Sequence, residues 1–226
     1  MQPHDFWQEL HPPRSFPTSG EFRDVYVAEL PDGRQLRLPI RVLADGEHAL
    51  ASLIINQAGF SVQEALALAL AERIAAHDVD VVAGLPTLGL TLASAVARAL
   101  GHDRYVPLGT SRKFWYREEL SVSLSSITTP SQEKRLYIDP RMLPLLQGKR
   151  VALIDDVISS GASIVSGLEL LSACAVEPVV IGAAMLQSER WRERVDASGK
   201  IWSERIVGVF STPILDRTGN GGWRRS

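Results

Sequence analysis

Two adjacent carboxylates, Asp155 and Asp156, are the side chains of this 226-residue chain whose neighbours best suit them to bind a ligand. They follow residues 151–154, an apolar run typical of a strand buried on both faces of a parallel sheet. Ligands of such open sheets collect where the strands end. Small residues come next, at 159–163, where backbone N–H groups can cradle a phosphate. Because two carboxylates repel a bare polyphosphate, the pattern favours a ligand that also presents hydroxyls or a cation, such as a sugar phosphate.

The full segment, residues 150–163, reads RVALIDDVISSGAS. It lacks the Gly-Lys-Ser/Thr of the nucleotide P-loop and the G-x-G-x-x-G of dinucleotide-binding folds. It resembles the phosphoribosyl-pyrophosphate (PRPP) motif of the type I phosphoribosyltransferases, which is an apolar strand, two acidic residues and a loop of small residues. The resemblance implies that Asp155 and Asp156 hold the ribose hydroxyls and help to place Mg²⁺, directly or through water. The alternative interpretation is that the segment is an ordinary connection from a strand through a turn to a helix, with two solvated aspartates and no ligand.

A second loop, residues 84–89 with the sequence GLPTLG, joins another expected strand to a helix at the same edge of the sheet. Taken alone, it favours a structural turn. Its position ahead of the PRPP motif implies, by the same resemblance, that it receives the pyrophosphate. The resemblance therefore assigns PRPP binding to the acidic pair and both loops: Pro86, Thr87, Leu88, Gly89, Asp155, Asp156, Val157, Ser159, Ser160, Gly161, Ala162 and Ser163.

A long irregular stretch, residues 109–139, is predicted to be a mobile loop, because unpatterned segments of this length in compact domains are commonly lids. It holds Arg112 and Lys113 beside the aromatic residues 114–116. The resemblance implies that these two cations join the acidic pair as catalytic residues and stabilise the leaving pyrophosphate when the lid closes. Basic residues among aromatics also suit single-stranded nucleic acid. A surface hairpin with its aromatics in the core is the third interpretation.

The base pocket has weaker signals. In the resembling family a variable hood covers the base, and the candidates here are residues 21–50, a predicted hairpin, and residues 190–215. Trp202 and Phe210 are available in the second segment for stacking. Family members acting on hypoxanthine and guanine carry an aspartate three residues after the acidic pair, where this chain has Ser159. That departure leaves adenine, xanthine, orotate, uracil or an unusual base open.

The elements that must position these residues alternate between strand and helix patterns. They predict an α/β fold, with an open, mostly parallel twisted sheet and helices on both faces. We expect one domain over residues 1–226, with an extended arm at 1–20 and the hood described above. The tail after Leu215, which contains Gly-Asn-Gly-Gly, is expected to be mobile.

Composition excludes several classes of protein. The net charge of -2 gives no electrostatic reason to expect nucleic acid or an anionic membrane as a partner. No apolar run approaches the roughly 20 residues of a membrane span, and the first residues lack a signal-peptide core. The single cysteine, Cys174, cannot form an internal disulfide. We therefore expect a cytoplasmic protein.

The sequence as a whole predicts a Mg²⁺-dependent phosphoribosyltransferase that transfers 5-phosphoribosyl from PRPP to a nucleobase, with a purine favoured. A homodimer is what the resemblance implies. The alternative is a PRPP-sensing regulator that binds the phosphosugar without turnover. A third interpretation is a hood that accepts a non-nucleobase amine or a larger partner. The patterns leave the base, the turnover and the oligomeric state undetermined, because base selection lies in the least patterned segments.

Overall fold

The computed structural model describes residues 2–124, 134–194, 199 and 201–225. One of its two five-stranded sheets is parallel and has the strand order β10-β9-β8-β4-β5. The strands are β4 (Val81–Gly84), β5 (Val106–Pro107), β8 (Val151–Ile158), β9 (Val180–Gln187) and β10 (Ile206–Thr212). The central strands are almost continuously buried, as their Val, Ile, Leu and Ala content predicts. The predicted parallel α/β sheet is confirmed.

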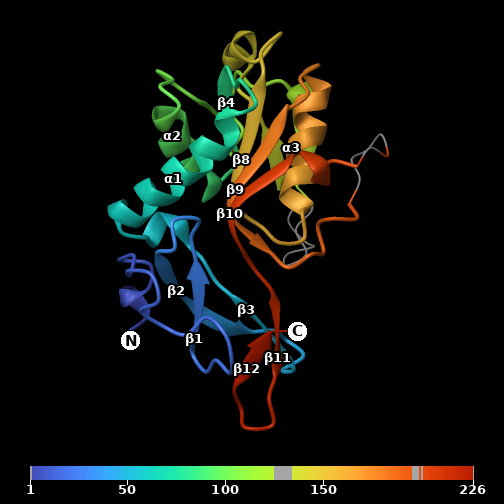
Figure 1. Ribbon diagram of the computed structural model, residues 1–226. Coiled ribbons are helices and arrows are strands. Elements are labelled where there is room, and N and C mark those ends of the chain that lie inside the picture. The colour runs from blue at the N-terminus through green and yellow to red at the C-terminus, as the bar shows by residue number, and fades with distance from the viewer. Residues whose placement is uncertain (1, 125–133, 195–198, 200, 226) are drawn as a thin grey trace.

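Helices cover both faces of this sheet, as expected. The α-helices α1 (Phe60–Ala75) and α2 (Gly89–Ala99) lie together on one face, and α3 (Ala162–Ala173) lies on the other (Figure 1). Two clusters of buried side chains fill the two interfaces. None of the helices in the described part of the chain is long and apolar enough to cross a membrane.

The hood is a second, antiparallel sheet with the order β1-β2-β3-β11-β12. Its strands are β1 (Val25–Glu29), β2 (Gln35–Val42), β3 (His48–Ala51), β11 (Ile214–Arg217) and β12 (Trp223–Arg225). Strand β10 runs out of the parallel sheet directly into β11, so the hood lies beyond the carboxyl ends of the parallel strands (Figure 1). The Gln187 side chain, at the end of β9, also donates to the carbonyl of Ala51 at 2.6 Å.

Two expectations about the C-terminal part are wrong. The hood takes residues 214–225 rather than 190–215, because residues 206–212 pair with β9 in the parallel sheet. The tail after Leu215 forms the β11–β12 hairpin, and Trp223 within it is 7% exposed. This tail is ordered because β11 pairs with β3 and Trp223 bridges to Phe22, both far away in sequence. Residues 195–198 and 200 of the expected hood lie outside the described residues.

The N-terminal arm is irregular apart from the short 3₁₀ turn η1 (Pro3–Asp5). It is fastened to the body by the Trp7 indole N–H, which donates to the carbonyl of Ser52 at 2.9 Å. Phe6 and Trp7 are both buried. His11 and Gln35 exchange backbone hydrogen bonds at the start of β2, where β3 does not reach. The arm thus completes one side of the hood.

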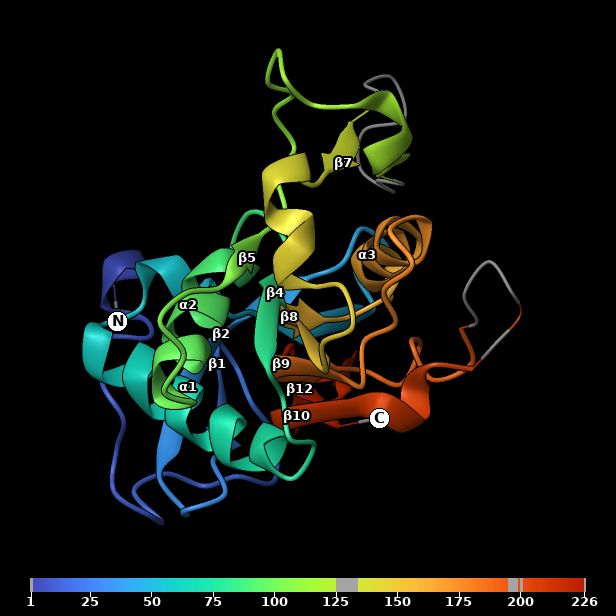
Figure 2. The same cartoon turned by 90° about the horizontal axis from the view of Figure 1, so that it is seen from above.

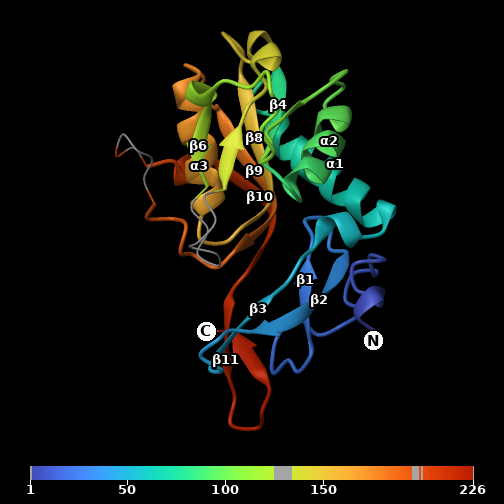
Figure 3. The ribbon, with the colours of Figure 1, turned by 180° about the vertical axis from the view of Figure 1, so that it is seen from behind.

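The predicted loop 109–139 contains a small hairpin, of β6 (Ser121–Ser123) and β7 (Arg135–Tyr137). Figure 3 shows β6 in front of α3, and Leu120 and Leu136 are buried in the cluster that surrounds α3. Residues 125–133 lie outside the described residues. The remaining 3₁₀ segments are η2 (Ile55–Gln57), η3 (Glu118–Leu120), η4 (Pro140–Leu145) and η5 (Ser203–Arg205).

Candidate functional site

The acidic pair lies inside the last part of β8, because the pairing with β9 continues to Ile158. Asp155 is 7% and Asp156 is 8% exposed, and the Asp156 N–H donates to Asp155 Oδ1 at 2.9 Å. Burial raises the pKa of the Asp155 carboxyl well above its usual range, and the neighbouring Asp156 raises it further. Burial also raises the pKa of Asp156. Two buried carboxyls of this kind are stabilised by a ligand that brings hydroxyl donors or a cation.

Residues 159–163, which we call the phosphate cup, join β8 to α3. Gly161 has a φ of +77° and comes directly before the first turn of α3, so the chain turns into the helix in the left-handed region that favours glycine. A hollow of about 90 Å³ opens here, lined by Asp155, Val157 and residues 158–164. A Cβ on Gly161 would also lie 2.8 Å from the Trp202 ring. The cup therefore combines small residues, a helix start and a rigid aromatic backing.

The 84–89 loop connects β4 to α2 beside the acidic pair. A Cβ on Gly89 would lie 2.7 Å from Asp155 Oδ1 and 2.9 Å from Asp155 Cα. The peptide between Pro86 and Thr87 is cis, and the Thr87 side chain is exposed. The structure thus brings the loop, the acidic pair and the phosphate cup to one edge of the sheet, as the sequence predicts.

The two predicted lid cations are not brought against the acidic pair. Arg112 forms an ion pair with Glu118 at 3.3 Å, and both side chains are more than half exposed. Lys113 is exposed and has no ion pair within the described ranges. Figure 2 shows the described chain that follows β5, up to residue 124, at one side of the molecule, beyond the edge of the parallel sheet. Their catalytic role stays a prediction.

The two predicted stacking residues are core residues instead. Trp202 is 0% exposed and packs behind Gly161, and Phe210 is 6% exposed within β10. Neither ring has a face open to a ligand, so neither forms a platform for a base. The sequence could not separate an aromatic that supports the cup from one that contacts a ligand, because the residue type alone is compatible with either place.

Arg190 is the site residue that the sequence analysis missed. Its Nη2 donates to Ser159 Oγ at 3.3 Å, and its Nε donates to Ser188 Oγ at 3.4 Å. It has no carboxylate partner within the described residues. Arg190 follows β9, the neighbour of β8, so its place after a buried strand was the available signal. The guanidinium brings a positive charge to the rim of the phosphate cup.

The donor set fits Mg²⁺ that is held mainly by its ligand. Within the part of the chain that the structure describes, no group of three His, Cys, Asp or Glu side chains could hold a metal ion. Asp155 and Asp156 offer only two carboxylates. Mg²⁺ commonly binds through one or two carboxylates together with phosphates and water, so a phosphorylated ligand would complete its coordination.

Comparison with known proteins identifies relatives of this arrangement. Residues 53–215 match the family described as the phosphoribosyl transferase domain. The chain is 31% identical over 140 residues to an orotate phosphoribosyltransferase of Halorhodospira halophila, a match covering 61% of this chain and 56% of the relative. It is 35% identical over 105 residues to a hypoxanthine/guanine phosphoribosyltransferase of Methanosarcina acetivorans, covering 46% and 51%. The chain thus spans about half the length of these curated relatives.

Solved structures share the fold. The adenine phosphoribosyltransferase of Giardia lamblia, complexed with 9-deazaadenine, superposes with a TM-score of 0.55 at 18% identity, over 67% of this chain and 80% of that one. The enzyme of Rhodothermus marinus gives a TM-score of 0.53 at 16% identity, over 84% of this chain and 94% of that one. At these identities the likeness concerns the fold alone.

Proposed function

The chain belongs to the phosphoribosyl transferase family, and on this premise we propose that it transfers 5-phosphoribosyl from PRPP to a ring nitrogen of a nucleobase. The reaction releases pyrophosphate and requires Mg²⁺. The protein acts as a homodimer. The catalytic residues are Asp155 and Asp156, with Arg112 and Lys113 joining them when the loop closes.

One observation carries this proposal: the close approach of Gly89 to Asp155, which joins the 84–89 loop to the acidic pair. With the ribose hydroxyls at Asp155 and Asp156, the 5′-phosphate fits the phosphate cup on one side and the pyrophosphate fits the 84–89 loop on the other. A single molecule of PRPP carries all three groups. A simple phosphate ester would leave the 84–89 loop without a role.

The chemistry needs positioning more than covalent participation. The bond from the ribose C1′ to pyrophosphate breaks with its electrons leaving on the pyrophosphate, and a lone pair of the base nitrogen forms the new bond to C1′. The base loses one proton to solvent in the overall reaction. The acidic pair orients the ribose through its hydroxyls, and its negative charge favours the positive charge that develops on the ring. Backbone N–H groups of the phosphate cup fix the 5′-phosphate. Mg²⁺, when bound, neutralises charge on the departing pyrophosphate.

We propose a purine as the acceptor. Ser159 stands where the hypoxanthine and guanine enzymes carry an aspartate, so among the purines adenine or xanthine is the proposed acceptor. Orotate is the second candidate, because it is the base in the name of the Halorhodospira halophila relative.

The test is a screen of the purified protein with Mg²⁺ and PRPP against adenine, xanthine, guanine, hypoxanthine, orotate and uracil, with pyrophosphate release as the readout. PRPP binding is measured in parallel by calorimetry. The double variant D155N/D156N serves as the blank. Release with one base establishes the transferase and names its substrate. Binding without release from any base indicates the regulator, and the absence of both overturns the proposal.

A further inference from the structure

The hood carries a hollow of its own, at the start of β1 and the second half of β2. Its volume is about 490 Å³, and small-molecule sites commonly measure roughly 300–1,000 Å³. The residues that line it come from the N-terminal arm, from β1 and the two residues before it, from β2 and from β12. Among these described residues, none belongs to the acidic pair, the phosphate cup or the 84–89 loop. We call this separate cavity the hood hollow.

The floor of the hood hollow is apolar. Val25 on β1 and Pro39 on β2 are directly opposite each other in the antiparallel ladder. Phe6 and Trp223 add two aromatic rings, and these side chains are 9% and 7% exposed. Flat apolar side chains of this kind offer a surface against which a planar ring packs.

Three arginines surround this floor: Arg23, Arg37 and Arg41. Arg37 and Arg41 lie on either side of Pro39, because residues two apart in a strand share a face. Extended by two residues, the register of β1 and β2 brings Arg23 to the level of Arg41. Like charges opposite each other on neighbouring strands are destabilising. An anion between these two guanidinium groups relieves their repulsion.

The positive charge of the hood hollow is not neutralised by the protein. Within the described residues, none of the three arginines forms an ion pair. Arg37 is held instead by Phe16, whose ring centroid lies 4.9 Å from the guanidinium carbon. In the described part of the chain, Asp24 is the one acidic side chain that lines the hollow. Three arginines against one aspartate leave an excess of two positive charges.

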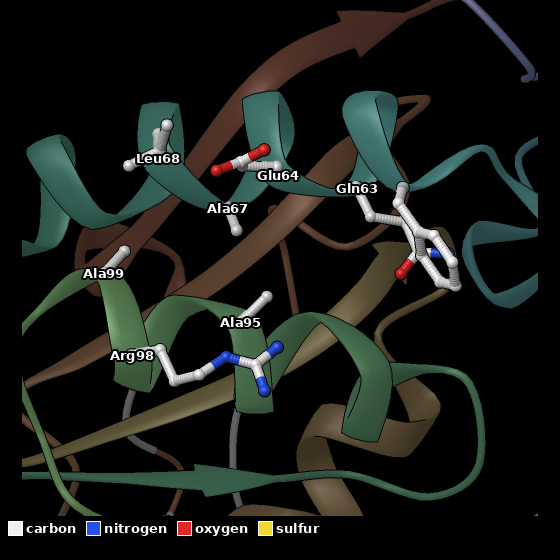
Figure 4. Close-up of a pocket in the computed structure, with 8 residues that line it drawn as sticks. Gln63, Glu64, Ala67, Leu68, Ala95, Arg98 and Ala99 are labelled. Carbon is white, nitrogen blue, oxygen red and sulfur yellow. The ribbon is translucent and has the colours of Figure 1, made fainter.

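The hollow between α1 and α2 has no such excess. It measures about 440 Å³ and is bordered by the two helices (Figure 4). Its charged residues within the described chain are Glu64 on α1 and Arg98 on α2, so its charges balance. Of these two cavities, the hood hollow is therefore the one suited to an anionic ligand.

We infer that the hood hollow binds a nucleotide with at least two phosphates. The planar fork of a guanidinium matches phosphate oxygens in bidentate contacts, and Arg23 and Arg41 face such a group from two strands. A diphosphate brings at least the two negative charges that the arginines leave unbalanced. The base packs on the apolar floor of Val25 and Pro39. Because Phe6 also lines the hollow, the bound nucleotide joins the N-terminal arm to the hood.

The test is calorimetric binding of ADP and GDP without Mg²⁺, PRPP or a nucleobase. The wild-type chain is expected to bind one nucleotide, with an affinity that falls as salt is added. Arg23→Gln and Arg41→Gln are each expected to weaken binding about tenfold, and the double variant R23E/R41E is expected to abolish it. Arg14→Gln is the matched control, because Arg14 is an exposed arginine of the arm that does not line the hollow. Adenosine and pyrophosphate, which each lack half of the ligand, should bind more weakly than ADP.

The outcomes identify the site as well as the ligand. A nucleotide bound at the phosphate cup would lose affinity in Arg190→Gln and keep it in R23E/R41E, and this pattern overturns the inference. A wild-type chain that binds neither ADP nor GDP overturns it too. Pyrophosphate bound as tightly as ADP would leave the apolar floor without a role and overturn the nucleotide as ligand.

The hood variants are expected to fold, because Arg23 and Arg41 are exposed, and circular dichroism checks this. No step of the test requires the transferase reaction. The inference and the proposed function therefore fail separately.

Discussion

The phosphate cup and the basic stretch 109–118 are held in place in different ways. The cup follows β8, the central strand of the parallel sheet, and its neighbours Asp155 and Asp156 are buried with Gly89 against them. Arg112 is instead held by an exposed ion pair with Glu118, which also pairs with Arg135. Exposed pairs of this kind contribute about 0.2–1 kcal/mol each. The cup is therefore preformed, whereas the position of the basic stretch is open to change on binding.

This difference indicates a division of labour. A preformed cup and acidic pair hold PRPP in register before reaction, because their positions are set by the packing of the sheet. Cations that arrive only on closure act on the charge that develops as pyrophosphate departs. Changes in the first region should therefore affect PRPP binding, and changes in the second should affect turnover.

Asp156→Asn tests the preformed region most severely. We expect kcat/KM to fall by about 10²–10³-fold, since a buried charge that orients the ribose is removed. The melting temperature should rise, because one of two buried neighbouring carboxyls loses its charge. Steady-state kinetics and calorimetric unfolding measure the two effects. Asp103→Asn, an exposed carboxylate, is the control. A fall in both activity and stability would make Asp156 a structural residue.

Lys113→Ala tests the basic stretch. We expect kcat to fall by about 10²-fold, because a cation that meets the leaving pyrophosphate is lost. PRPP affinity, measured by calorimetry, should change little. Lys149→Ala is the control, since Lys149 is exposed and precedes β8, at the opposite edge of the sheet. Equal losses of affinity and turnover would place Lys113 in the preformed region and remove the distinction.

Gly89→Ala tests the contact between the 84–89 loop and the acidic pair. The added Cβ meets backbone and side-chain atoms of Asp155 at under 3.0 Å, so the loop must shift. We expect an overpacking cost of about 1–3 kcal/mol in the free energy of unfolding and a KM for PRPP raised by about tenfold. Gly109→Ala, whose Cβ would meet nothing within 4 Å, should change neither value. A Gly89→Ala protein with wild-type KM would remove the observation on which the proposed function rests.

Arg190→Gln asks whether the rim of the cup belongs to the preformed region. Loss of a charged donor to the 5′-phosphate is expected to raise the KM for PRPP by about tenfold, with kcat nearly unchanged. Binding of ribose 5-phosphate should weaken in parallel. Arg192→Gln is the matched control, because Arg192 pairs with Glu189 and stacks on Trp191 instead. A rise in the KM for the base alone would assign Arg190 to the acceptor.

The sequence was sufficient for the parts of the fold set by local pattern. The apolar run at 151–154 predicted β8, the loop 84–89 was expected to follow a strand, which is β4, and small residues after β8 predicted the cup. The strand β8 is longer than its apolar run because ladder pairing with β9 carries it through Asp155 and Asp156. An aspartate can lie inside a strand when the neighbouring strands form hydrogen bonds with its backbone N–H and C=O groups. Composition alone does not reveal this pairing.

Long-range contacts account for what the sequence analysis missed. Strands β11 and β12 are short and surround Gly-Asn-Gly-Gly, so they look like a mobile tail until β3 is placed beside them. Trp202 contacts Gly161 across 41 residues, a separation that no helical or strand period reports. The side chains of the basic stretch show no helical or strand periodicity either, because exposed ion pairs fix their positions and packing against the core does not.

Glu118→Gln gives the smallest expected effect and tests the exposed pairs directly. It removes the partner of Arg112 and Arg135, so the free energy of unfolding should fall by less than about 1 kcal/mol. If the pair holds Arg112 away from the site, its loss makes closure easier and raises kcat by about two- to fivefold, which is the same energy expressed as a rate. The increase should shrink at high salt, where the wild-type pair is already screened. Glu119→Gln, at the adjacent exposed carboxylate, should leave kcat unchanged. A lower kcat in Glu118→Gln alone would mean that the ion pair builds the active arrangement, and the basic stretch would then be as preformed as the cup.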